Sequence, residues 1–276
     1  MHIQVLYVNR DYSYDKDWLD AFSDVGAELI DKPQKLDADL IVVQHSVGAH
    51  DGIFPKWMID NILSRRGKVV LFFTNEFKHV TERKELAEML NADFICTQLP
   101  DGRLYDYPTI SLPHALNPKV FYNKKTERDI SFGFRGNLYR KGIYDARNEI
   151  IKSFHRVSGS DIKFDADFKK RGHWAAFLNR CKAMPGAEAG DKRGRIVSPR
   201  HLEAIGCGCL NVLLPGEYCG VLSPDHYLTF TTIEEAIDVV LDEKRRSEIT
   251  ERALAHVLEN HTYRHRVDLL MKKINA

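Results

Sequence analysis

The stretch SPRHLEAIGCGCLNVLL, residues 198–214, places a carboxylate beside a run of small residues. Glu203 comes directly before Ala204–Gly208, and an apolar strand is predicted over Leu210–Leu214. Small residues allow the backbone to approach a ligand or a neighbouring strand closely. A carboxylate at such a bend can accept hydrogen bonds from both hydroxyls of a ribose, as the acidic residue of dinucleotide-binding folds does. The alternative is a closely packed helix end on which Glu203 is only solvated.

Polar residues at the ends of two other predicted strands form a second candidate set. His45 ends the apolar run Ala38–His45, and Asn75 and Glu76 follow the run Lys68–Phe73. Ligands bind outside the carboxyl ends of parallel strands, and the pKa of an imidazole suits a general base that takes a proton from a hydroxyl. We predict His45 as this base; an ordinary hydrogen-bonded histidine at a strand end is the alternative.

Short apolar runs alternate with amphipathic segments along the chain, which indicates parallel sheets covered by helices. In the first half, strands are predicted at His2–Val8, Ala38–His45, Lys68–Phe73, Asp93–Thr97 and Thr109–Leu112, and helices at Asp15–Val25, Pro55–Arg66 and Thr81–Leu90. In the second half, strands are predicted at Asp129–Phe134, Asp161–Phe164, Lys182–Pro185, Leu210–Leu214 and Tyr227–Phe230. Helices are predicted there at Gly142–Phe154, Trp174–Cys181, Pro199–Ile205, Thr232–Asp242, Lys244–Leu258 and Tyr263–Ile274.

This alternation breaks once, at Pro113–Lys125, where prolines and asparagines replace the periodic pattern. We therefore predict an α/β fold of two Rossmann-like, doubly wound domains that face a cleft, residues 1–122 and residues 123–276. We leave open whether the last helix, Tyr263–Ile274, crosses back to the first domain.

The composition is that of a globular protein, and it excludes several classes. The net charge of +1 is too small for a chain that binds polyanions over its whole surface. The five cysteines match no zinc-binding spacing and indicate a reducing compartment. The longest apolar runs, such as Val69–Phe73, are far shorter than a transmembrane helix. We expect a cytoplasmic protein without a transmembrane segment, and leave open a peripheral contact with a membrane.

Four short motifs in the second half carry a family resemblance. They are Arg200–Gly208, similar to an R-x-x-E-A-x-x-x-G element; Ile233–Ala236, similar to an acidic helix start; His261–Arg266, similar to H-T-Y-x-x-R; and Phe132–Gly142, similar to F-x-G-x-x-x-x-K-G. In this order and spacing they resemble the C-terminal half of GT-B glycosyltransferases, and more narrowly the group 1 and CgeB-like families. The first domain resembles these enzymes in architecture alone.

The resemblance implies a site for a nucleotide sugar in the second domain, with the acceptor on the side of the first. Glu203 would bind the ribose hydroxyls, and Gly206 would allow close packing beneath the nucleotide. Arg140 and Lys141 would face the diphosphate, with Arg200 as a further cationic contact. No metal ion is implied, because GT-B enzymes stabilise the leaving diphosphate with cations and helix ends.

One spacing departs from the family pattern. Many retaining GT-B enzymes have two glutamates in the spacing E-x7-E. Counted back from Glu203, the position of the first glutamate is occupied by Arg195. Glu188, in the loop Pro185–Gly190, is the nearest carboxylate, and we predict that it contacts the donor sugar. The segment Asp191–Ser198 lies between them, and its cations, Arg195 among them, would help to hold phosphate. Retaining or inverting stereochemistry stays open.

The function implied is a hexosyltransferase-like, metal-independent transfer of a sugar from a UDP- or GDP-linked donor to an acceptor hydroxyl. The acceptor is open among a glycan, a lipid-linked molecule and a small molecule. Two alternatives remain: a GT-B-like binding protein without turnover, and a phage-type glucosyltransferase acting on nucleic-acid bases. The net charge disfavours strong binding to a phosphate backbone without excluding it, and a small aromatic and basic acceptor site is open at Tyr7, Arg10, Tyr12 and Tyr14.

Overall fold

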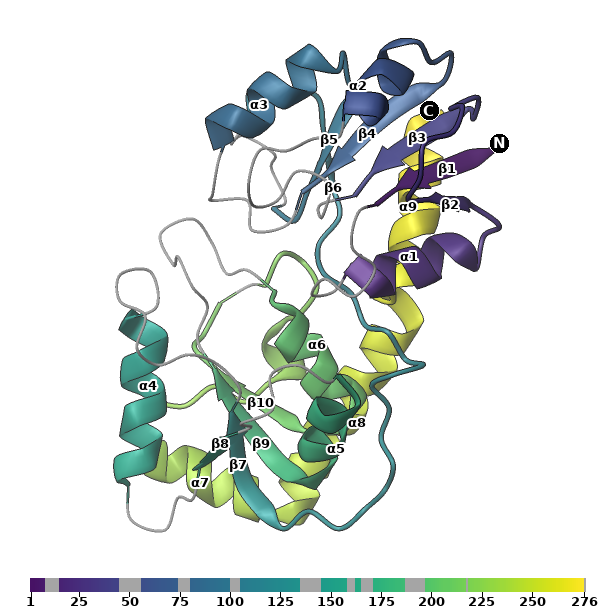
Figure 1. The fold of residues 1–276 in the computed structure, drawn as a ribbon. Helices are drawn as coiled ribbons and strands as arrows, with labels where there is room; N and C mark the ends of the chain where they lie inside the picture. The colour runs from purple at the N-terminus through teal and green to yellow at the C-terminus, as the bar shows by residue number, and fades with distance from the viewer. Residues whose placement is uncertain are drawn as a thin grey trace. The chain divides into compact units, whose positions relative to one another are not determined.

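The computed structural model describes residues 1–7, 15–44, 56–73, 80–99, 105–134, 145–157, 162–164, 171–186, 197–216 and 218–275. The chain divides into two compact units, each built around its own sheet (Figure 1). Unit 1 comprises Met1–Pro113 together with Tyr263–Ala276, and unit 2 comprises His114–Thr262.

Unit 1 contains a parallel six-stranded sheet in the order β2-β1-β3-β4-β5-β6. Its strands are β1 (Ile3–Leu6), β2 (Glu28–Ile30), β3 (Leu40–Val43), β4 (Lys68–Phe72), β5 (Phe94–Thr97) and β6 (Thr109–Ser111). Its helices are α1 (Asp15–Ser23), α2 (Lys56–Leu63), α3 (Val80–Met89) and α9 (Tyr263–Asn275). All four residues of β3 are buried, as the uninterrupted apolar run predicts for a strand covered on both faces.

Two apolar layers hold the helices of unit 1 against its sheet. Alternate strand residues such as Ile41 and Leu71 pack with Met58 of α2 and Ala87 of α3. On α1, the fully buried Trp18 lies with its ring centroid 4.3 Å from that of Phe72. Full burial of one such aromatic side chain contributes roughly 1.5–3 kcal/mol.

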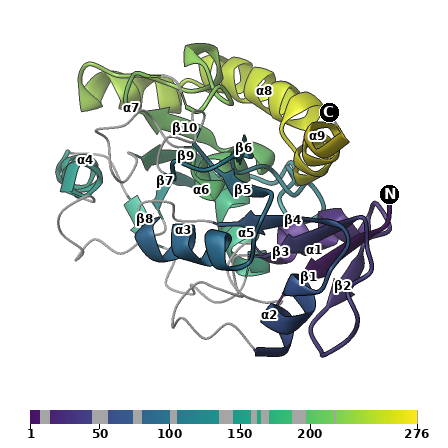
Figure 2. The ribbon, with the colours of Figure 1, turned by 90° about the horizontal axis from the view of Figure 1, so that it is seen from above.

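Unit 2 contains a parallel four-stranded sheet in the order β10-β9-β7-β8. Its strands are β7 (Ile130–Phe134), β8 (Ile162–Phe164), β9 (Cys181–Gly186) and β10 (Leu210–Leu213). Its helices are α4 (Asp145–Arg156), α5 (Arg171–Arg180), α6 (Pro199–Gly206), the 3-10 turn η2 (Pro224–His226), α7 (Ile233–Leu241) and α8 (Glu243–Asn260), and Figure 2 shows α7 and α8 next to each other. The predicted strand Tyr227–Phe230 is wrong, because this segment adds only an isolated bridge from Leu228 to Val212.

The helices of unit 2 are divided between the two faces of the sheet. α5, α6 and α8 share one apolar core, to which Trp174, Leu202 and Val257 contribute. α4 and α7 share the other, to which Phe154 and Val240 contribute. This is the doubly wound arrangement that the strand–helix alternation predicts.

The chain passes between the units twice, after Pro113 and after Thr262. On each side, a hydrogen bond joins the two passing segments within one unit. Arg266 of α9 donates from Nε to the Pro113 carbonyl, 2.9 Å away, and burial lowers the pKa of its guanidinium to about 10. In unit 2, the Leu116 amide donates to the His261 carbonyl at 2.9 Å. The last helix therefore belongs to unit 1, and the H-T-Y-x-x-R motif lies at the return crossing.

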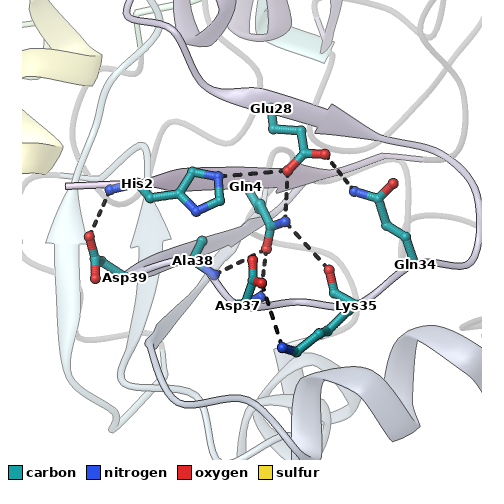
Figure 3. Close-up of polar contacts among 8 residues, drawn as sticks. All are labelled: His2, Gln4, Glu28, Gln34, Lys35, Asp37, Ala38 and Asp39. Atoms are coloured by element: carbon teal, nitrogen blue, oxygen red, sulfur yellow. Dashed lines mark hydrogen bonds and ion pairs between the residues drawn. The ribbon is translucent and has the colours of Figure 1, made fainter.

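A buried glutamine organises the amino-terminal edge of the unit 1 sheet (Figure 3). The Gln4 amide donates to Glu28 at 2.7 Å and accepts from the Asp37 and Ala38 amides at 3.1 and 3.2 Å. Hydrogen bonds from Gln4 and then Gln34 lower the pKa of Glu28. The network fixes β2 and the segment that enters β3, on the edge opposite the one where ligands bind.

None of the helices in the described part of the chain combines the length and the apolar character needed to cross a membrane.

Candidate functional site

The topology of unit 2 points to the carboxyl ends of β7 and β9 as the place where a ligand would bind. β7 lies between β8 and β9. The chain passes from β7 to β8 on one side and from β9 to β10 on the other, so the direction of the connections reverses between β7 and β9. In doubly wound sheets ligands bind at this reversal. The last residues of the two strands are Phe134 and Gly186. The side chains that reach these two positions define the site.

Arg200, in the first turn of α6, brings a cation to the end of β7. Its guanidinium carbon lies 5.7 Å from the centroid of the Phe134 ring. Cations over aromatic faces at this distance are held by the ring quadrupole. The helix begins after an extended Ser198 with Pro199, which has no N–H, and the His201 amide donates to the Ser198 carbonyl at 3.1 Å, so the Arg200 amide is the first N–H at this helix start. The cation and the helix start together form a site suited to phosphate oxygens.

His201 brings a neutral imidazole to the end of β9. Its Nδ1 accepts the Ser198 amide at 3.3 Å, which places the ring proton on Nε2. That Nε2 lies 3.6 Å from the point where a Cβ on Gly186 would stand. Burial, and then the charge of Arg200, lower the pKa of His201 to about 3. His201 therefore remains a neutral hydrogen-bond donor at physiological pH.

Glu203 is held by a second helix. The indole Nε1 of Trp174 donates to its Oε2 at 2.8 Å, and Trp174 is only 1% exposed. Trp174 is the fourth of the ten residues of α5, and Glu203 is the fifth of the eight residues of α6, three positions after Arg200. Residues three apart on a helix are neighbours, so the half-buried Glu203 lies on the same face of α6 as Arg200.

Gly206 is closely packed against another part of unit 2. A Cβ at this position would stand 2.6 Å from Leu116 Cδ1 and 2.7 Å from the Phe121 carbonyl oxygen. The close passage of the chain at 116–121 thus leaves no room for a side chain here, and the role of Gly206 beneath a nucleotide stays a prediction. At Gly208, φ is +68°, and a Cβ would meet Asn123 and Arg128.

The other predicted site residues fall where the structure gives no description. His45, Glu188, Arg140, Lys141 and Arg195 all lie outside the described residues, so their roles remain predictions. The same holds for Asn75 and Glu76.

The structure adds residues that the motifs did not single out. Trp174 was predicted as part of a helix only, and nothing in a separation of 29 residues indicates its bond to Glu203. His201 stood out in the sequence only as a neighbour of Glu203. Its position as the third residue of a helix that begins with Ser-Pro was the available indication, because this position reaches back to the helix start.

Unit 1 has a corresponding reversal between β1 and β3, and Gln44 lies there. Gln44 directly follows β3 and is 1% exposed, and among the described residues neither its Nε2 nor its Oε1 has a hydrogen-bond partner. A buried polar group without a partner costs about 1–3 kcal/mol. The fully bonded Gln4 on the other edge shows the usual arrangement. Gln44 therefore brings unused hydrogen-bonding capacity to the edge where His45 is predicted to act.

The fold is that of GT-B glycosyltransferases, as predicted. An alpha-glucosyltransferase in complex with UDP and a 13-mer DNA superposes with a TM-score of 0.66 and 11% identity over 100% of both chains. A T4 phage beta-glucosyltransferase in complex with its UDP-glucose substrate gives 0.61 and 11% over 99% of both chains. A glycosyltransferase from Rickettsia africae gives 0.61 and 8% over 99% of this chain and 97% of that one.

The sequence agrees with the fold in its second half. Residues 146–272 match the family described as glycosyl transferase-like. The matched segment contains Trp174, Arg200, His201 and Glu203. None of the curated proteins matches the chain in sequence. The predicted resemblance to group 1 glycosyltransferases is confirmed, while the narrower CgeB-like resemblance stays a prediction.

Proposed function

We propose that the protein transfers a sugar from a nucleoside diphosphate sugar, UDP- or GDP-linked, to an acceptor hydroxyl without a metal ion. The observation that carries this proposal is the Glu203 carboxylate, oriented by Trp174, on the helix that brings Arg200 and His201 to the ends of β7 and β9. These groups lie within the segment that matches the glycosyl transferase-like family.

Each of these groups has a separate task in the proposed reaction. Glu203 accepts hydrogen bonds from the ribose diol and fixes the nucleoside. Arg200 and the start of α6 neutralise the diphosphate, on which negative charge grows as the bond to the sugar breaks. His201 donates one neutral hydrogen bond from Nε2, which orients a phosphate or sugar oxygen without adding charge. His45 remains the proposed base that takes the proton of the acceptor hydroxyl, and Glu188 the proposed contact to the donor sugar.

Nucleotide binding tests the proposal. Titration calorimetry with UDP, GDP, ADP and their glucose conjugates is expected to give one preferred nucleotide. Glu203→Ala should weaken its binding by at least about 10-fold, because each hydrogen bond to a charged group contributes about 1.5–3 kcal/mol. Glu259→Ala, at an exposed glutamate of α8, is the matched control and should bind like wild type. Equal affinity in wild type and Glu203→Ala would refute the assigned site.

A nucleic-acid acceptor is the second candidate. It is supported by two structural neighbours, an alpha-glucosyltransferase in complex with a 13-mer DNA and the DNA modifying enzyme beta-glucosyltransferase. An assay of radiolabelled glucose transfer from UDP-glucose should compare three acceptors: duplex DNA with hydroxymethylated pyrimidines, oligosaccharides and a lipid-linked sugar. Transfer to DNA that falls steeply with salt would favour this candidate, because phosphate contacts release counterions. Transfer only to a glycan or lipid would exclude it.

A further inference from the structure

We infer that Trp174 is a positioning residue for donor recognition: its indole N–H fixes the Glu203 carboxylate in the orientation that binds a ribose diol. The site would therefore prefer ribonucleotides to 2′-deoxyribonucleotides. The inference rests on the proposed function, in which Glu203 contacts the ribose.

The first argument is the rigidity of the Trp174 side chain, which donates the hydrogen bond. Trp174 is 1% exposed, and its ring is stacked on that of Phe177 with the centroids 5.7 Å apart. Its Nε1 is 2.8 Å from Glu203 Oε2, a good distance for a hydrogen bond to a carboxylate. A tryptophan buried in this way cannot follow a moving glutamate. It selects one orientation of the glutamate carboxylate.

The second argument is the chemistry of the indole N–H group. An indole N–H only donates, carries no charge and does not titrate. Unlike an arginine or lysine partner, the indole therefore holds Glu203 without neutralising its charge. An ionised carboxylate has about four lone-pair sites, and the indole occupies one of them. The indole N–H therefore sets the direction in which the carboxylate lies and adds no charge of its own.

The third argument concerns the cost of ordering the site. A glutamate side chain that must be immobilised by its ligand weakens binding by about 0.5–1.5 kcal/mol, or roughly 2- to 10-fold in Kd. Trp174 removes that cost before the ligand arrives. The gain applies to ligands that use the oriented carboxylate, so it should be larger for ribose than for 2′-deoxyribose.

The competing explanation is that the bond only joins α5 to α6. In that case loss of the indole N–H would lower the thermal stability of unit 2 and leave nucleotide preference unchanged. The two explanations therefore differ in the ratio of two affinities, which a purely stabilising contact does not change.

The experiment measures Kd for UDP and 2′-deoxy-UDP, and for GDP and 2′-deoxy-GDP, with wild type and three variants. Trp174→Phe keeps an aromatic ring and removes the N–H. Phe177→Leu alters the packing around Trp174 and keeps the N–H, so it is the matched control. Glu203→Ala removes the carboxylate itself. The melting temperature of each variant is recorded alongside.

We expect wild type and Phe177→Leu to prefer the ribonucleotide by the same factor. Trp174→Phe should reduce this preference about fivefold, and Glu203→Ala should abolish it. A Trp174→Phe variant with the wild-type preference, alongside a Glu203→Ala variant that has lost it, would overturn the inference alone. A wild-type preference in Glu203→Ala would overturn the proposed function and the inference with it.

A second measurement does not depend on how well Trp174→Phe folds. The chain has three tryptophans, so a protein labelled with ¹⁵N-tryptophan gives three indole N–H resonances. Trp18→Phe and Trp57→Phe assign the third resonance to Trp174 by elimination. That resonance should shift in Glu203→Ala and on addition of UDP to wild type. An unchanged Trp174 resonance in Glu203→Ala would overturn the inference.

Discussion

The stability of unit 2 should depend on pH through His201. Burial lowers the pKa of this imidazole from 6.5 to about 3, so the folded chain keeps it neutral while the unfolded chain protonates it. The unfolded state then binds more protons below about pH 6.5, and the free energy of unfolding falls as the pH falls from 6.5 toward 3. Above pH 6.5 the contribution is complete and constant.

The magnitude follows from the two pKa values. Between pH 8 and pH 5 the single group should lower the free energy of unfolding by about 2 kcal/mol, at roughly 1.4 kcal/mol per pH unit once protonation of the unfolded state is under way. Because pH 5 is still well above 3, the loss in this window depends mainly on the unfolded pKa. Carboxylates titrate below this window, so they add little to it.

His201→Gln is the matched variant, because glutamine can still accept the Ser198 amide at the third position of the helix. Urea unfolding followed by Trp174 fluorescence, in a background of Trp18→Phe and Trp57→Phe, measures the stability of unit 2 at each pH. The difference in unfolding free energy between this background and the same background carrying His201→Gln should change by about 2 kcal/mol from pH 8 to pH 5. The same change must be absent for His155→Gln, at an exposed histidine of α4. A difference that stays constant with pH would refute the buried, neutral His201.

Three further outcomes follow from contacts in unit 2. Gly206→Ala should lower the free energy of unfolding by about 1–3 kcal/mol, measured by urea unfolding, because its Cβ would stand 2.7 Å from the Phe121 carbonyl oxygen; an unchanged stability would mean that the chain there moves away freely. Arg128→Ala should cost about 3 kcal/mol in a thermal scan, because its guanidinium donates to the carbonyls at positions 178, 181 and 207, and Arg128→Lys should recover only part of it. Cys219 should react first with a thiol reagent in the native protein, because the other four cysteines are buried. Burial also raises the pKa of Cys181, Cys207 and Cys209, which lowers their thiolate fraction. Mass spectrometry that shows earlier modification of another cysteine would contradict this.

The central strands of both sheets could be predicted because their apolar runs are uninterrupted. β3 and β4 are examples, and each lies within two residues of its predicted bounds. β2 was not predicted, because Glu28–Ile30 is too short to show a period and only Ile30 is buried. Local pattern identified the edge strands β6, β8 and β10 but not β2, in which only one residue is buried.

The domain boundary shows a different limit. Pro113–Lys125 was assigned mostly to the first domain because it lacks periodicity, whereas the compact units divide at Pro113. The reason is that Leu116 and Phe121 are buried in the core of unit 2, where Phe121 lies against Gly206. A loop that packs tightly against another element has no sequence period, so only the structure assigns it.

The candidate site was predicted in part. The residue types predict a binding role for Glu203 at the end of a helix, which stays a prediction, and the structure places Arg200 and His201 of the same helix at the ends of β7 and β9. The partner of Glu203 could not be predicted, because Trp174 reaches it from another helix, 29 residues away in sequence. Contacts between elements depend on packing, which residue spacing does not encode.

The most direct test of the central claim is a crystal structure of the protein with UDP, or with GDP if calorimetry selects it. The account predicts that both ribose hydroxyls lie within hydrogen-bonding distance of the Glu203 carboxylate, which Trp174 still holds, and that the diphosphate lies at the start of α6 beside Arg200. A nucleotide bound elsewhere in unit 2, or a ribose that does not contact Glu203, would contradict it.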